Sequence, residues 1–127
     1  MQFRPRYFAF LIALALPLVP AHAHHSTAPY DLIHGTIVSG TVTRFEWENP
    51  HSMLFLDVST DGAPEHWVIE MESLVILRRL GWAKDTLKPG DTVTVVGSRA
   101  KDQSFRMRAG YVQWPDGHKL QCLPTQS

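Results

Sequence analysis

Residues 36–48, TIVSGTVTRFEWE, decide the expected fold. The first small and apolar side chains of this stretch fall at alternate positions: Val38, Gly40 and Val42. Phe45 and Trp47 are also two residues apart, but they belong to the opposite phase. Because side chains alternate between the two faces of a strand, a change of phase requires an extra residue, so we predict a bulge or sharp coil between Thr43 and Phe45. A long first strand that curls in this way is what a small barrel requires.

The sequence beyond this stretch continues with strand patterns and turn signals. Alternating apolar residues predict strands within 52–59, 66–71, 87–97 and 105–114, and a short returning strand over 118–123. One face of the strand in 105–114 is expected to carry Phe105, Met107, Ala109 and Tyr111. Residues 72–82 change to the three- and four-residue apolar spacing of a helix, with Ser73 as the expected N-cap and Gly81 closing its end.

Three strands, a helix, two strands and a small hairpin therefore follow one another. This order predicts a mainly β fold, a small five-stranded OB-like Greek-key barrel with one short helix between strands three and four and a C-terminal hairpin. The alternatives are an SH3-like barrel and a sandwich fragment, and the position of the helix argues against both. We expect the domain to span residues 36–123, with a lead-in segment over 24–35 and a tail over 124–127.

Upstream of the lead-in, residues 1–23 have the layout of a secretory signal peptide. Arg4 and Arg6 precede an apolar run over 7–16, and Ala21-His22-Ala23 fits the small-x-small cleavage rule. The apolar run is shorter than the roughly 20 residues that span a bilayer. We therefore predict cleavage between Ala23 and His24, a periplasmic or secreted location, and no transmembrane segment in the mature chain.

Composition narrows the classes of partner. The chain has 12 basic and 12 acidic side chains and no basic stripe, which together with export argues against nucleic acid. Cys122 is its one cysteine, so no internal disulfide can form. Either Cys122 is a partly buried small hydrophobe, or it pairs with a second chain.

Several short motifs resemble a family of small exported bacterial proteins of unknown function. The matching positions are His24–Ser26, Phe45–Trp47, Asn49–His51, Leu77–Arg79, Gly81–Trp82 and Lys88–Asp91. The resemblance covers nearly the whole mature chain and implies export and the same fold. It implies no activity, cofactor or partner.

Histidines suggest one candidate metal site. After cleavage, the α-amine and imidazole of His24 would chelate one Cu(II), because copper favours nitrogen ligands in planar geometry. His25 and His51 are the candidates for a further ligand. Alternatively, the two N-terminal histidines sit on a tail whose ordering costs too much entropy for tight binding, and His51 hydrogen-bonds the backbone of its turn.

The loop after the first strand is the candidate ligand face. Its residues are Glu46, Trp47, Glu48, Asn49 and His51. Glu46 and Glu48 are two residues apart, so on a strand their carboxylates would share one face. Two such carboxylates repel each other unless they are solvated or bound. The alternative is a solvated outer face, with the tryptophans packed in the core or at its rim.

No zinc-hydrolase, calcium, serine-nucleophile or phosphate-loop motif is present in the sequence. We therefore expect a non-enzymatic binding module for a small ligand, a metal ion or a partner protein. The two rivals are a copper-binding protein built on His24 and a structural interaction subunit of an envelope complex. An enzyme is the least favoured interpretation.

Overall fold

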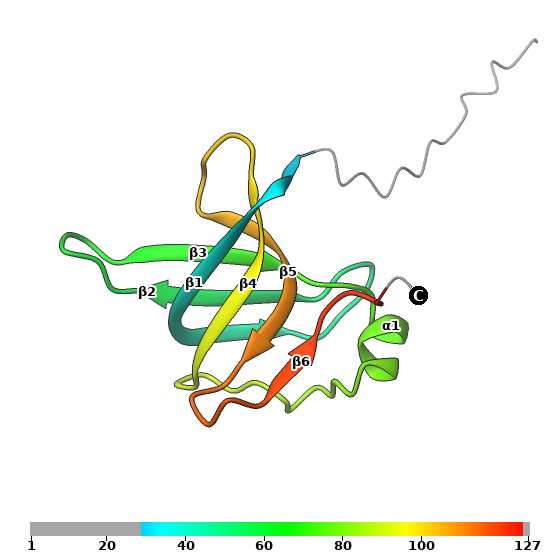
Figure 1. The fold of residues 1–127 in the computed structure, drawn as a ribbon. Coiled ribbons are helices and arrows are strands. Elements are labelled where there is room, and N and C mark those ends of the chain that lie inside the picture. The colour runs from blue at the N-terminus through cyan, green and yellow to red at the C-terminus, as the bar shows by residue number, and fades with distance from the viewer. Residues whose placement is uncertain (1–28, 126–127) are drawn as a thin grey trace, which may run out of the picture.

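The computed structural model describes residues 29–125, which form one sheet and one short helix (Figure 1). The elements are β1 (Tyr30–Glu46), β2 (Met53–Val58), β3 (Glu65–Glu70), α1 (Leu74–Arg79), β4 (Thr92–Ala100), β5 (Arg106–Gln113) and β6 (Lys119–Gln121). The fold is therefore mainly β, with a short helix between β3 and β4 and a C-terminal β5–β6 hairpin, as predicted.

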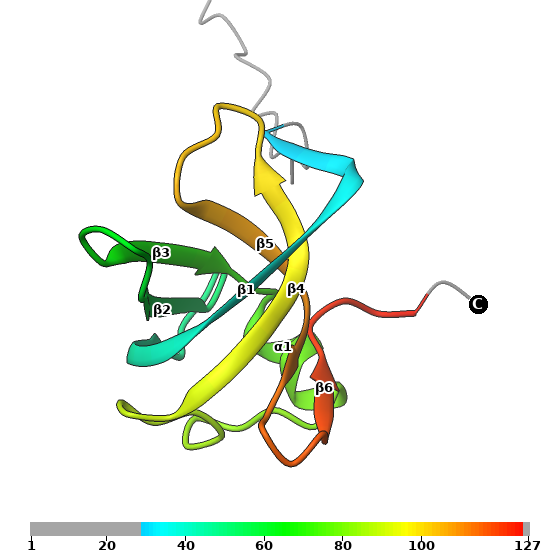
Figure 2. The ribbon, with the colours of Figure 1, turned by 60° about the vertical axis from the view of Figure 1, so that its left-hand side comes forward.

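The sheet closes into a ring. Its strand order is β3-β2-β1-β4-β5-β6, and these neighbours pair antiparallel. A further, parallel pairing joins Val68–Glu70 of β3 to Arg106–Arg108 of β5 and connects the two sides of the sheet. In Figures 1 and 2, β1 and β4 run diagonally across the front of this ring, and α1 lies at one end near β6.

β1 starts at Tyr30, earlier than the sequence indicates. Residues 30–35 were expected to belong to the lead-in, but Tyr30 pairs with Ala100, and regular pairing with β4 resumes at Gly35. Between these points, the Asp31 carboxylate accepts hydrogen bonds from the backbone N–H groups of Ile33 and His34. This local bonding breaks the two-residue alternation, which is why the pattern does not reveal the start of the strand.

The predicted bulge of β1 lies at Thr43. Val42 pairs with Leu56 and Arg44 pairs with Phe55, so Thr43 is the extra residue. The bulge changes which residues point inward: Val42 is buried before it, and Phe45 packs against the core after it. The first strand therefore bends from pairing with β4 to pairing with β2.

The core fills the ring with one face of each main strand. Its fully buried members include Leu54, Leu56, Ile69, Leu77, Val93, Val95, Met107, Ala109 and Val112. In β5 the expected inward set was wrong at both ends: Phe105 is exposed and Tyr111 is half-buried, whereas Val112 is buried. The pairing shifts between Val96–Tyr111 and Gly97–Ala109, and the extra residue, Gly110, exchanges the two faces.

α1 is capped from a distant loop. Ser73 holds the N-cap position, as predicted, but its side chain makes no capping hydrogen bond. The Asn49 side-chain oxygen instead accepts a hydrogen bond from the Leu74 N–H, at 3.1 Å. Gly81 follows the helix with φ +94°, a conformation that suits glycine, and ends it as expected.

The C-terminal segment is anchored to the sheet. The Cys122 N–H donates to the Gly110 carbonyl, and the Trp82 indole donates to the Gln121 carbonyl. Cys122 is completely buried, so it is a core residue and not only partly buried as the sequence suggests. Within residues 29–125, no helix has the length and apolar character needed to cross a membrane.

Candidate functional site

Three polar side chains from separate segments meet beside one end of β1. The Tyr30 hydroxyl donates a hydrogen bond to Oε2 of Glu70 at 2.6 Å, and Nδ1 of His51 lies 2.7 Å from Oε1 of the same carboxylate. Tyr30 is buried, and the side chains of His51 and Glu70 retain 29% and 21% of their exposure. A single half-buried carboxylate therefore bridges a tyrosine and a histidine.

The fold holds each of these residues in place. Tyr30 opens β1 opposite Ala100, the last residue of β4. Glu70 ends β3 and pairs with Met53. The loop that carries His51 is fixed by the adjacent, buried Ser52, whose backbone bonds Met71 and Glu72 beyond the end of β3. Backbone pairing, and not only the side-chain contacts, therefore sets the geometry.

Tyr30 acts as a hydrogen-bond donor over the physiological pH range. Burial raises the pKa of its hydroxyl to about 12, and the hydrogen bond to Glu70 and the charge of Glu70 act in the same direction. Arg106 and Arg108 oppose this rise. The hydroxyl hence keeps its proton and points it at the carboxylate.

A pocket of about 310 Å³ opens beside this group, and it is called the polar pocket here because four of its seven lining residues are charged. Its lining residues are Pro29, Tyr30, Glu70, Ala100, Lys101, Asp102 and Arg106. Two cationic and two anionic side chains surround this small volume, which matches the lower end of ligand-site sizes. Such a lining is suited to a small polar molecule that carries both signs of charge.

A second pocket has a volume of about 450 Å³, and Arg108 is among its lining residues. Glu72 and Arg108 form a half-buried ion pair in its wall. The remaining lining is Leu32, Gly97, Ser98, Gly110, Leu123 and Pro124. This pocket is more apolar than the first, and its ion pair is neutral as a unit.

The sequence matches the model of one known protein family. The model of DUF6152, a family of unknown function, matches residues 12–108. This chain belongs to DUF6152. The predicted resemblance to a family of unknown function is thus confirmed, and no curated protein matches the sequence.

The predicted ligand-face residues of this DUF6152 protein have different surroundings. Glu46 ends β1, and its Oε1 forms an ion pair with Nε of Arg44 at 3.0 Å. Glu48 lies beyond the strand, and its backbone carbonyl accepts a hydrogen bond from the Ser52 hydroxyl. The two carboxylates therefore do not share a strand face. Trp47 packs beside Phe45, with the Arg78 guanidinium 5.8 Å from its ring centre. Asn49 caps α1. His51 is the predicted ligand-face residue that contacts Glu70.

Of the three predicted metal ligands of this DUF6152 protein, the described residues include His51 alone. His24 and His25 lie outside the described residues. Within 29–125, no three histidine, cysteine or acidic side chains are grouped so that they could hold a metal ion. His34, His66 and His118 are exposed, and each pairs with a nearby carboxylate, of Asp31, Asp57 and Asp116 respectively.

Tyr30 and Glu70 were not among the site residues predicted from the sequence. Glu70 carries a usable signal, because it lies next to Ile69 and points away from the core at the end of a predicted strand. Tyr30 carries none, since it lies in a segment without periodicity. Their hydrogen bond joins positions 40 residues apart, which only the closed ring brings together.

Proposed function

We propose that the ring of strands is an OB-like Greek-key barrel. The supporting observations are the pairing of β1 with both β2 and β4, the parallel β3–β5 contact, and the helix between β3 and β4. In this fold, ligands bind near the loops that follow strands one and four. Here the loop after β4 carries Lys101 and Asp102, which line the polar pocket. The loop after β1 carries His51, which contacts the lining residue Glu70.

The protein is proposed to act outside the cytoplasm, in the periplasm or as a secreted protein. The support is the signal-peptide layout of residues 1–23, with cleavage between Ala23 and His24. Amino-terminal sequencing of the protein recovered from the periplasm tests this directly. A sequence that starts with His24 is expected, and one that starts at Met1 would contradict the proposal.

The proposed function is that of a binding module for a small polar ligand. The observation that carries it is the convergence of Tyr30, Glu70 and His51 beside the charged pocket. Arg106 and Lys101 would hold an anionic group, and the carboxylates of Glu70 and Asp102 a cationic one. A zwitterion of amino-acid size is the ligand class that satisfies both.

Titration of the ¹⁵N-labelled protein with free amino acids tests this function. Saturable shifts of the backbone signals of Tyr30, Ala100 and Lys101 are expected for at least one of them. Arg106→Gln should weaken that binding about tenfold, because a charge-assisted hydrogen bond is lost. Arg44→Gln is the matched control, since Arg44 is an exposed arginine on β1 outside the pocket. Shifts elsewhere, or equal effects of both variants, would refute the proposal.

Copper binding is the second candidate, and the His51–Glu70 contact favours it. In the neutral ring that donates from Nδ1 to Glu70, the lone pair is on Nε2, the type of nitrogen that metal ions bind. Tyr30, which contacts the same carboxylate, is six residues from His24, and six residues reach at most about 20 Å. The amine and imidazole of His24 are therefore within reach of His51.

Calorimetric titration of Cu(II) into correctly processed protein tests the copper site. One equivalent is expected to bind tightly, and either an extra amino-terminal residue or His51→Ala should abolish the tight phase. His66→Ala is the matched control, because His66 is also held by a carboxylate but lies on β3, at 2.6 Å from Asp57. Weak binding that is equal in all four proteins would end the copper proposal and leave the small-ligand and structural-subunit alternatives.

A further inference from the structure

A groove lies over the start of β4 and the end of β5. Its volume is about 400 Å³, and its lining residues are Thr92, Val93, Thr94, Gln113, Trp114 and Pro115. These residues come from the start of β4 and the end of β5, whereas the charged pocket adjoins Ala100 at the other end of β4. The groove is a separate feature from the proposed polar site.

The lining of this groove is uncharged. Three of its six residues, Thr92, Thr94 and Gln113, have side chains that both donate and accept hydrogen bonds. Trp114 adds part of an indole, one face of which is stacked against His118, and Pro115 adds a small apolar surface. None of the six carries a charge, so the groove offers no strong partner for a phosphate, a carboxylate or an ammonium group.

The sheet aligns these groups in a row. Ser39 of β1 pairs with Thr94, Thr94 with Gln113, and Gln113 with Lys119 of β6, so one line of polar residues crosses four strands. The Ser39 and Thr94 hydroxyls are 2.8 Å apart, which places both on the same face. The polar groups therefore form a row along one face of the sheet.

The indole of Trp114 is held in a fixed orientation. The His118 ring stacks on it with centroids 4.3 Å apart and an interplanar angle of 12°, and Trp82 packs against it at 5.9 Å. Asp116 in turn holds Nδ1 of His118 at 2.6 Å. An aromatic side chain that is fixed before binding loses little conformational entropy on contact with a ligand.

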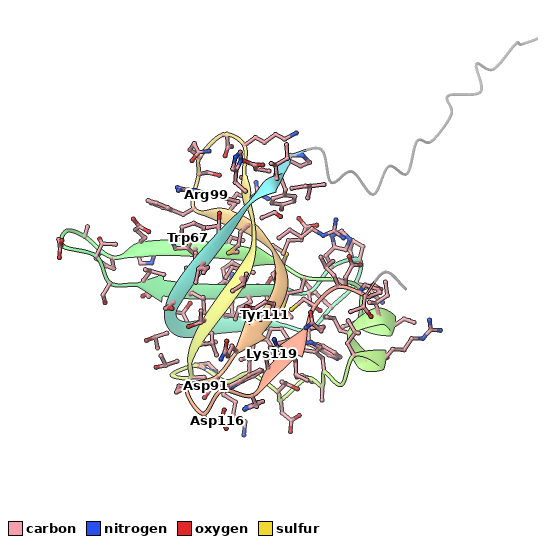
Figure 3. The ribbon with its side chains drawn as sticks, in the orientation of Figure 1. Trp67, Asp91, Arg99, Tyr111, Asp116 and Lys119 are labelled. Atoms are coloured by element: carbon pink, nitrogen blue, oxygen red, sulfur yellow. The ribbon has the colours of Figure 1, made fainter. Side chains whose placement is uncertain are left out.

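Further polar groups surround the groove. Figure 3 shows Asp91 at the start of β4 and Asp116 in the β5–β6 turn, next in sequence to the lining residues Thr92 and Pro115. Lys119 begins β6 opposite Gln113, and its ammonium lies 5.0 Å from the centre of the Tyr111 ring of β5. Carboxylate oxygens at one end would accept hydrogen bonds from ligand hydroxyls.

We propose that this groove binds a neutral glycan chain. A sugar ring has apolar C–H faces, which pack on an indole, and a rim of hydroxyl groups that donate and accept hydrogen bonds, as threonine and glutamine do. A chain of such rings is elongated and fits a row of polar groups that crosses several strands. An apolar ligand would cover the Thr92 and Gln113 side chains without offering them a hydrogen bond, and a charged ligand would find no counter-charge among the six lining residues.

Titration with maltohexaose, cellohexaose and chitohexaose tests the proposal, with a heparin hexasaccharide as the charged counter-probe. At least one neutral chain should shift the backbone signals of Thr92, Thr94 and Gln113 in a saturable manner. Trp114→Ala should weaken binding about tenfold or more, since the stacking surface is lost. Trp47→Ala is the matched control, because Trp47 is also a half-buried tryptophan packed against the core.

Thr94→Val keeps the shape of the side chain and removes its hydroxyl, so it tests the site even if Trp114→Ala does not fold. It should weaken the binding of the neutral chain several-fold. The proposal is overturned if no neutral chain binds, if only the heparin fragment binds, or if Thr94→Val leaves the affinity unchanged. Shifts confined to residues near Glu70 would overturn it as well, since they would assign the sugar to the polar pocket.

Discussion

Gly97 is the glycine at which an added Cβ would meet its nearest neighbour at the shortest distance. A Cβ built at this position would lie 2.0 Å from the Arg108 carbonyl oxygen, which is backbone and cannot move aside cheaply. We expect Gly97→Ala to lower the free energy of unfolding by about 3 kcal/mol. Gly35→Ala is the control on β1, where a Cβ would meet nothing within 4 Å, and it should change stability by less than about 1 kcal/mol. Urea denaturation of both variants measures the difference, and equal costs would contradict the clash.

Cys122 links stability to alkaline pH. Burial, assisted by the charge of Glu72, raises the pKa of its thiol from 9.0 to about 12. Above pH 9 the unfolded chain releases the thiol proton while the folded protein keeps it, so the folded state is stabilised less as pH rises. We expect the free energy of unfolding to fall by about 1 kcal/mol between pH 9 and pH 10 from this group.

The slope of stability against pH measures this effect. Cys122→Ala should remove the loss between pH 9 and pH 10, whatever its own effect on absolute stability. In the native protein the thiol should also resist alkylation until urea unfolds the chain, since the nucleophilic thiolate is not populated. Rapid alkylation of the folded protein at pH 8 would be incompatible with the buried position of Cys122.

At the scale of elements, α1 depends on a residue outside it. The Asn49 side chain bonds the Leu74 N–H, whereas the Ser73 side chain makes no cap. We expect Asn49→Ala to lower the free energy of unfolding by about 1 kcal/mol, the usual value of a helix cap. Ser73→Ala is the matched control and should cost clearly less. A larger effect of Ser73→Ala in urea denaturation would restore the local cap that the sequence suggests.

Elements defined by local alternation could be predicted from the sequence. Leu54, Leu56, Trp67 and Ile69 alternate without interruption, and all are buried as their phase requires. The bulge at Thr43 was also predictable, because apolar residues mark both phases around it. The second phase change, at Gly110, was not, since Tyr111 and Val112 are both strand formers and only the pairing with β4 decides which of them points inward.

The candidate site was less predictable than the strands, for a related reason. His51 stands out in the sequence because of its loop, but its partner Glu70 is brought to it by the pairing of β2 with β3. Asn49 lies in the same loop and serves a helix that begins at Leu74. Residue type and spacing identify candidates, whereas side-chain partners from distant strands depend on the closed sheet.

At the scale of the whole molecule, we expect the β3–β5 contact to make the ring one cooperative unit. Ile69 and Met107 are partners in this contact, and both are completely buried. Ile69→Ala and Met107→Ala should each lower the free energy of unfolding by about 2–5 kcal/mol. Because the two side chains share one contact region, the double variant should cost about 1 kcal/mol less than the two single costs added together.

Urea unfolding followed by far-ultraviolet circular dichroism and by tryptophan fluorescence should give coincident transitions in all variants. The fluorescence reports from three parts of the molecule, because Trp67 lies in β3, Trp82 in the segment after α1 and Trp114 in the β5–β6 turn. Separate transitions, or strictly additive costs, would show that the two sides of the sheet unfold independently and that the ring is closed only weakly.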